Sequence, residues 1–150
     1  MIYSMEKRSA RTSPLIQFKG DYMREIIVGT SISVDTVVDE NMLAKSVGSG
    51  DLEVYATPMM IALMENAAAT ALAEFLEDGE TSVGTMVNIS HLSATAKGRN
   101  VSASATITAV DGKRIDFDIT ATDDVGLIGK GTHSRFIVDS DRFMAKTQEK

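Results

Sequence analysis

The sequence TPMMIALMENAAATALA, residues 57–73, decides the fold. Its only polar residues are Thr57, Glu65, Asn66 and Thr70. A helix built from this stretch is apolar on nearly all sides, unlike a surface helix with one apolar stripe, so other structure must surround it. Thr57 and Pro58 predict its start, because a threonine side chain can cap the first free amides and proline suits the first helical position. We expect the helix to run from residue 58 to about 77.

Alternation of apolar and polar residues predicts β-strands with one buried face on both sides of this helix. Before the helix we expect a strand over residues 30–38, a short helical turn capped by Asp39, and a short strand over 52–56. After it we expect an antiparallel meander of four strands, over residues 82–95, 100–110, 113–123 and 125–138. Asp111-Gly112 between two alternating runs predicts a two-residue hairpin.

These elements predict an α+β domain in which an antiparallel sheet of five to six strands wraps around one long helix, with no second helix after it. This architecture is the hotdog fold. A sheet curled over one helix keeps an open edge, so we expect a homodimer at minimum, in which the sheet continues across two subunits, or a tetramer built from it.

Composition narrows the class of protein. The 150 residues suit one globular domain, which we place at residues 23–150. Residues 1–22 show neither helical nor strand period, and we interpret them as a flexible arm without function. The absence of cysteine excludes a disulfide framework and thiolate chemistry, and a net charge of -6 disfavours nucleic acid. No apolar stretch is long enough to span a membrane, so we expect a cytoplasmic protein.

Two residues are unusual for their apolar surroundings. Glu65 lies in the middle of the predicted helix, and no Lys or Arg occurs between residues 57 and 80 to neutralise it. It is either a functional carboxylate or one that points to solvent or to a subunit interface. His91 shares strand parity with Ile89, which turns it toward the helix, although a lone inward histidine is more often structural than catalytic.

The start of the helix is a third candidate. Free amides and a partial positive charge at a helix N-terminus suit a carbonyl oxygen that becomes an oxyanion. Thr57 can combine its role as a cap with such chemistry, and a strand that crosses the helix could bring His91 within reach of Thr57 and Glu65. The other histidine, His133, shares a strand face with Arg135, and we interpret the two as a surface or interface pair.

Four segments together resemble the fluoroacetyl-CoA thioesterase type of hotdog protein. They are ATPMMIALMENAA (56–68), SVGT (82–85), HLSATA (91–96) and GKGTHSR (129–135), and the resemblance covers about residues 23–148. It implies an acyl-CoA thioesterase with Thr57, Glu65 and His91 as catalytic residues. It further implies that Gly84 lies close to the acyl thioester and that Arg135 lies near CoA or the pocket wall.

Some features of this resemblance leave alternatives open. We expect His91 to be the general base, with Thr57, Glu65 or a water molecule as the nucleophile, and amides near Pro58 to polarise the carbonyl.

The loop at 47–52 has glycines where the fluoroacetate-specific enzyme has an aromatic lid, so we expect a small acyl group without selectivity for fluorine. No metal or cofactor is implied, since CoA is part of the substrate. The alternative is that this hotdog protein binds acyl-CoA without hydrolysing it.

Candidates for contact with the CoA phosphates are the basic residues Lys97, Arg99, Lys130 and Arg135.

Overall fold

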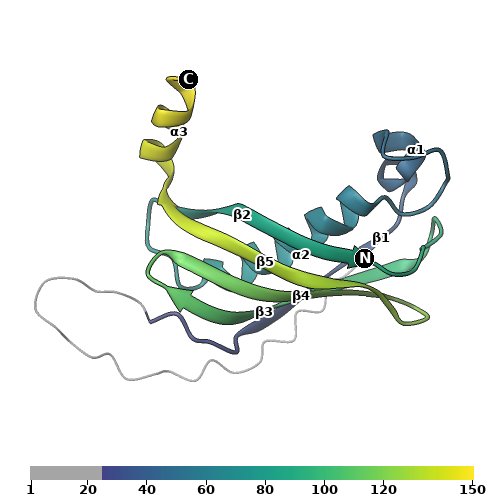
Figure 1. The fold of residues 1–150 in the computed structure, drawn as a ribbon, viewed down its shortest axis with the longest axis horizontal. Coiled ribbons are helices and arrows are strands. Elements are labelled where there is room, and N and C mark those ends of the chain that lie inside the picture. Colours follow the sequence, from purple (N-terminus) through teal and green to yellow (C-terminus); the bar gives the residue numbers. More distant parts are fainter. Residues whose placement is uncertain (1–24) are drawn as a thin grey trace, which may run out of the picture.

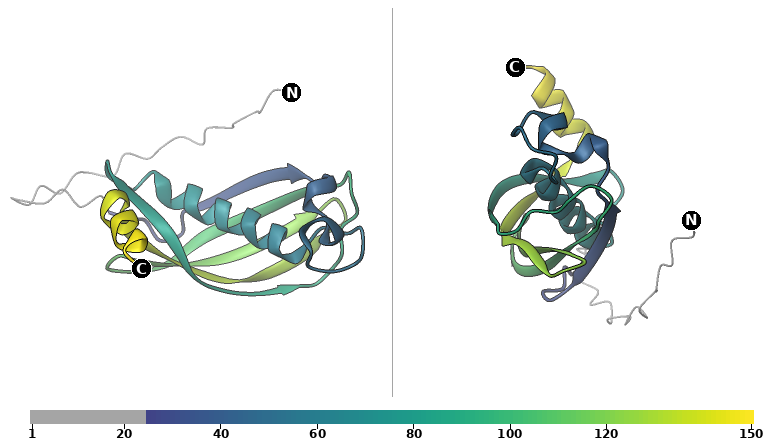
Figure 2. Two further views of the ribbon diagram at one scale, coloured as in Figure 1. Left: turned by 90° about the horizontal axis from the view of Figure 1, so that it is seen from above. Right: turned by 90° about the vertical axis from the view of Figure 1, so that its right-hand side faces the viewer.

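The computed structural model describes residues 25–150, so the arm predicted at residues 1–22 lies outside the described residues. One antiparallel sheet curls around the central helix α2 (Thr57–Ala73), as Figures 1 and 2 show. Its strands are β1 (Ser31–Val37), β2 (Glu80–His91), β3 (Asn100–Asp111), β4 (Arg114–Asp123) and β5 (Leu127–Asp139). The prediction of an α+β hotdog fold, with a sheet wrapped around one long helix, is confirmed.

The order of strands differs from the predicted meander. The sheet runs β1-β3-β4-β5-β2, so β3, β4 and β5 form consecutive hairpins while β2 pairs with β5. Residues 92–99 carry the chain from β2 at one edge back to β3 on the other side of the sheet. Alternation shows which face of a strand is buried but not which strand lies beside it, and this is why the meander prediction is wrong for β2.

Helix α2 starts one residue earlier and ends earlier than expected. Ala56 occupies the N-cap position without a side-chain hydrogen bond, and Thr57 is the first helical residue. The predicted capping role of Thr57 is wrong, because its hydroxyl hydrogen-bonds to His91 instead. The helix ends at Ala73, and Gly79, with a φ of 83°, lies in the turn before β2 rather than at the helix end.

The short elements before α2 agree in part with expectation. Asp39 caps the 3-10 helix η1 (Glu40–Met42) by accepting a hydrogen bond from the backbone N–H of Asn41, and α1 (Ala44–Val47) follows. The strand expected at 52–56 consists only of isolated bridges, from Tyr55 to Leu43 and from Val54 to Ala96.

Two features lie after β3. The predicted hairpin between β3 and β4 is confirmed, but Asp111 pairs with Arg114, so the turn is Gly112-Lys113. A second helix, α3 (Ser140–Gln148), contradicts the expectation of only one helix. Asp139 caps it by accepting from the backbone N–H of Arg142, and none of its residues is buried. In Figures 1 and 2 it extends away from the sheet.

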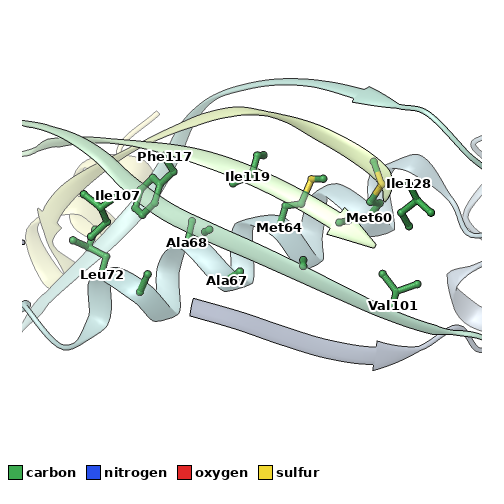
Figure 3. Close-up of a cluster of buried hydrophobic side chains, with 14 of the residues drawn as sticks. Met60, Met64, Ala67, Ala68, Leu72, Val101, Ile107, Phe117, Ile119 and Ile128 are labelled. Atoms are coloured by element: carbon green, nitrogen blue, oxygen red, sulfur yellow. The ribbon is translucent and has the colours of Figure 1, made fainter. Parts of the chain in front are cut away.

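The core lies between α2 and the concave face of the sheet, as Figure 3 shows. The buried residues of α2 are Met60, Met64, Ala67, Ala68, Ala71 and Leu72. They pack against β3 and β4, which contribute Ile107, Phe117 and Ile119. Small alanines on α2 allow the sheet to approach the helix closely. Among residues 25–150, no helix is long and apolar enough to cross a membrane.

Candidate active site

The first residue of α2 and the last residue of β2 meet at one end of the sheet. Thr57 Oγ1 lies 2.7 Å from His91 Nδ1. In the tautomer with the ring proton on Nε2, the threonine hydroxyl donates to Nδ1. Nε2 is buried and makes no hydrogen bond within the described residues. The pair therefore has the geometry of a hydroxyl activated by a general base, with a second ring nitrogen free to meet an acceptor.

The helix start beside this pair has few free amides. Pro58 is the second helical residue and has no N–H, while the N–H groups of Met59 and Met60 both donate to the Ala56 carbonyl over 3.0 Å. The Thr57 N–H makes no hydrogen bond in the part of the chain that the structure describes. Of the amides expected near Pro58, the one available to a carbonyl oxygen at this helix start is that of Thr57.

A cavity of about 300 Å³ opens on Thr57 and His91. Its other walls come from Ala44, Ser49, Val54, Tyr55 and Leu92–Ala94. This volume is at the small end of ligand pockets, which suits a small group. Tyr55, which the sequence does not single out, is buried, and its hydroxyl donates to the carbonyl of Met59 over 3.1 Å. Burial raises the pKa of Tyr55 to about 12, so it remains a neutral wall residue near neutral pH.

Glu65 lies two turns further along α2, where it has a partner from another element. Its Oε2 is 3.6 Å from Nη1 of Arg135, on β5. The Glu65 side chain is 39% exposed, whereas that of Arg135 is 9% exposed. The helix itself provides no neutralising cation, as the sequence indicates, and the sheet supplies one instead.

Arg135 and His133 form a buried pair, so their interpretation as a surface or interface pair is wrong. Arg135 Nη1 donates to His133 Nε2 over 3.2 Å, and its Nε and Nη2 donate to the hydroxyl and carbonyl of Ser82. His133 Nδ1 lies 2.7 Å from the carbonyl oxygen of Met86. Burial lowers the pKa of both side chains, and for Arg135 the Glu65 carboxylate opposes this shift. The Arg135 guanidinium is thus engaged within the fold, and its contact with CoA stays a prediction.

Gly84 leaves space for the Glu65 carboxylate. A Cβ atom at Gly84 would lie 2.6 Å from Glu65 Oε2 and 3.3 Å from His133 Cε1. The pairing of β2 with β5 shifts by one residue between Gly84 and Met86, which marks a β-bulge. The absence of a side chain at Gly84 therefore allows the carboxylate to contact the backbone of β2. The proximity of Gly84 to a thioester stays a prediction.

The three predicted catalytic residues do not assemble within one chain. Thr57 and His91 form one group, and Glu65 belongs to the other, with Arg135. Eight residues separate Thr57 from Glu65 along α2, which corresponds to about 12 Å of helix rise. No hydrogen bond or ion pair joins Glu65 to His91 within residues 25–150.

Between the two groups, the edge strand β2 presents an exposed surface. Residues 84–88 are all exposed, including Met86 at 43% and Val87 at 37%. In the described chain β2 pairs on one side only, with β5. When the middle of an edge strand is exposed on both faces and has no hydrogen-bonded neighbour on one side, another strand typically covers it.

A sheet wrapped around one helix, with a hydroxyl–imidazole pair at the helix start, defines a hotdog protein of the thioesterase class. The family model for fluoroacetyl-CoA-specific thioesterase matches residues 38–141. The fluoroacetyl-CoA thioesterase of Streptantibioticus cattleyicolor is 41% identical over 98 residues, which cover 65% of this chain and 70% of that protein. The chain belongs to the fluoroacetyl-CoA-specific thioesterase family.

Solved structures agree with this assignment. A structure of the fluoroacetyl-CoA thioesterase FlK superposes with a TM-score of 0.80 at 34% identity, covering 84% of this chain and 98% of that one. A threonine-to-serine mutant of FlK in complex with acetyl-CoA gives 0.79 at 33% identity, over 82% and 97%. A thioesterase superfamily member from Thermus thermophilus gives 0.78 at 30% identity, over 85% and 94%.

The sequence holds a signal for the buried pair that our surface interpretation overlooks. His133 and Arg135 share strand parity with Ile137, which is buried. That parity turns both polar side chains toward the core side of β5. For Ser82 and Tyr55 we find no comparable signal, because their roles depend on which strands and loops lie beside them.

Proposed function

We propose that this protein is an acyl-CoA thioesterase that hydrolyses a small acyl-CoA to a carboxylic acid and free CoA. The observation that carries the proposal is the 2.7 Å contact between Thr57 Oγ1 and His91 Nδ1 inside a small cavity at a helix N-terminus. A base beside a hydroxyl, at a positive helix end, is suited to attack on a carbonyl carbon. Membership of a thioesterase family supports the same reaction.

In this proposal the thioester carbonyl oxygen points to the free N–H of Thr57 at the start of α2. His91 Nδ1 takes a proton either from the Thr57 hydroxyl, which attacks, or from a water molecule that this hydroxyl holds. The new C–O bond gives a tetrahedral oxyanion, which expels CoA as the C–S bond breaks, and the imidazolium returns the proton to the leaving thiolate. On the threonine route, water then hydrolyses the acyl ester by the same steps.

We further propose that the working unit is a homodimer in which two copies of β2 pair antiparallel. The exposed edge and faces of residues 84–88 support this arrangement, because pairing there would cover Met86 and Val87 and satisfy the free edge. A two-fold axis through Val87 would set Val87 opposite its own copy and Gly84 opposite the partner's Ser90, next to the partner's His91.

The dimer would complete the predicted catalytic set. The Glu65 carboxylate lies directly over Gly84, so the same pairing would bring it toward the partner's His91. The Nε2 atom of that histidine is buried and needs an acceptor. A carboxylate there would orient the imidazole and stabilise its charged form, as the third member of a triad does. In the alternative role, Glu65 itself attacks and forms a mixed anhydride.

The acyl group is proposed to be small and not selected for fluorine. The segment over 47–52 has no aromatic side chain, and it borders the cavity through Ser49. Of the basic residues considered for the CoA phosphates, Lys97 forms a surface ion pair of 2.7 Å with Glu40, and both side chains remain more than half exposed. Lys130 lines a separate cavity between β2, β4 and β5.

The reaction is tested by incubating the purified protein with acetyl-, fluoroacetyl-, propionyl- and butyryl-CoA and measuring the free thiol. We expect release with the short substrates and comparable kcat/KM for acetyl- and fluoroacetyl-CoA. No release above background would reject hydrolysis. Tight binding of acyl-CoA that survives His91→Ala, without turnover in the wild type, would favour the alternative of a binding protein.

The dimer is tested by Val87→Arg, which places a charge at the proposed axis. We expect this variant to be monomeric by light scattering, since two like charges would lie side by side in a paired sheet. Val125→Arg is the matched control, because Val125 is 95% exposed in the turn between β4 and β5. Equal masses for both variants and the wild type would argue against pairing through β2.

A further inference from the structure

The buried polar chain behind Glu65 carries an inference that rests on the proposed function. We propose that His133 is a positioning residue for that site: as a neutral acceptor it holds the guanidinium of Arg135, which in turn fixes the Glu65 carboxylate. No step of the proposed reaction otherwise uses this histidine.

The two ring contacts of His133 define its protonation state. Nδ1 lies 2.7 Å from the carbonyl oxygen of Met86, and since a carbonyl only accepts, Nδ1 carries the proton. Nε2 faces Nη1 of Arg135 at 3.2 Å, and since a guanidinium only donates, Nε2 is unprotonated. Only the neutral ring satisfies both contacts. Complete burial of the residue, together with the nearby Arg135 charge, lowers the pKa of His133 in agreement with this state.

The hydrogen-bond acceptors around Arg135 determine the orientation of its guanidinium group. Ser82 accepts from Nε and Nη2 at 2.8 and 2.9 Å, which leaves Nη1 for His133 and Glu65. With His133 in place, Nη1 lies 3.2 Å from the ring nitrogen and 3.6 Å from the carboxylate. Without that acceptor, a buried N–H would lose its partner, and the guanidinium would turn away from Glu65 to find another.

The carboxylate needs this support because its own side chain is partly exposed. Glu65 is confined on one side by the backbone at Gly84, where no Cβ intrudes, and on the other by Arg135. A partly exposed, flexible carboxylate contributes to catalysis only when it is held in one orientation. His133 also binds the Met86 carbonyl, next to the bulge that Gly84 borders, so it ties the carboxylate to the edge strand.

The test compares two amides that each keep one of the histidine contacts. In His133→Gln the longer side chain places its oxygen near the Nε2 position and can accept from Arg135. In His133→Asn the shorter side chain keeps a donor near the Nδ1 position for Met86 but leaves Arg135 without the acceptor. We expect His133→Asn to lower kcat by about tenfold or more with little change in KM, and His133→Gln to recover most of the loss. A purely structural role would not separate the two variants in this way.

A double-mutant cycle with Glu65→Gln shows whether His133 acts through the carboxylate. We expect His133→Asn to lower kcat in the wild-type background and to add less than about a threefold loss in the Glu65→Gln background. Wild-type kcat in His133→Asn, or losses that multiply independently, would overturn the proposal while the thioesterase function stands. Wild-type kcat in Glu65→Gln would instead overturn the role of Glu65 in the proposed function.

Ser82→Ala is the second variant in case the histidine substitutions fail to fold. It removes the hydroxyl that accepts from Arg135 Nε and leaves His133 in place. We expect it to lower kcat in the wild-type background but not in the Glu65→Gln background. An unchanged kcat in the wild-type background would also overturn the proposal, because the orientation of Arg135 would then not matter for turnover.

Discussion

The hydroxyl of Thr57 is hydrogen-bonded to an imidazole, although a threonine at a helix start usually caps the helix. It lies 2.7 Å from His91 Nδ1, and the N-cap position belongs to Ala56. The helix therefore gains no capping hydrogen bond from Thr57. Such a bond usually stabilises a helix by about 1 kcal/mol. At this residue the fold gives up a stabilising contact, and such a local departure is typical of a functional site.

Substitutions at Thr57 separate chemistry from stability. Thr57→Val keeps the shape but removes the hydroxyl, and we expect it to lower kcat by about a hundredfold or more. Thr57→Ser keeps the hydroxyl and should retain much of the activity. Because the hydroxyl does not cap α2, both variants should unfold at nearly the wild-type temperature in calorimetry. Wild-type kcat in Thr57→Val would show that the hydroxyl takes no part in turnover.

At the scale of elements, β2 has the largest influence on the site. It carries Gly84 near its middle and His91 at its end, and it lies at a free edge of the sheet in the described chain. Helix α3, by contrast, has little influence on the site, since none of its residues is buried and it extends away from the sheet (Figure 1). Elements without buried contacts contribute little to the stability of the remaining fold.

Deletion of α3 tests this view. A chain that stops after Asp139 keeps all five strands and α2, so we expect its midpoint of urea unfolding to stay close to that of the full chain. Circular dichroism should show a loss of helix signal only. A large fall in the midpoint would show that α3 packs on the fold more closely than its exposure indicates.

The limits of prediction from sequence also appear at this scale. The apolar stretch of α2 and the alternation in β3 and β4 predict the layers of the fold, because periodicity reports burial. Pairing of β2 with β5 could not be predicted, because alternation carries no information about neighbouring strands. The sequence predicts only that Thr57 and His91 lie within reach of each other. The pair of Glu65 with Arg135 depends on the position of β5 relative to α2, and the contact of His133 with Met86 depends on the unpredicted pairing of β2 with β5.

For the whole molecule, the stability should depend on pH through His133. Its pKa is lowered in the fold mainly by burial, so the unfolded chain binds the proton more tightly than the folded one. The free energy of unfolding should therefore be constant above the ordinary histidine pKa of about 6.5 and fall as the pH decreases below it. The slope for one proton is at most about 1.4 kcal/mol per pH unit.

Urea unfolding of the wild type and of His133→Gln between pH 5 and 8 measures this dependence. The variant should lose less stability between about pH 6.5 and 5 than the wild type does, because it lacks the titrating group. Identical pH profiles would show that His133 is not the group responsible. Location in the cytoplasm and assembly into a homodimer or a tetramer stay predictions.

The central claim is that one catalytic site combines Thr57 and His91 of one subunit with Glu65 of the other. Its most direct test mixes two inactive variants, Glu65→Gln and His91→Ala, under conditions that exchange subunits. Each mixed dimer would contain one complete site, so thiol release should return to about a quarter of the wild-type rate at equal mixing. If the mixture stays as inactive as its components while subunit exchange is verified, the site does not form across the dimer and the account is contradicted.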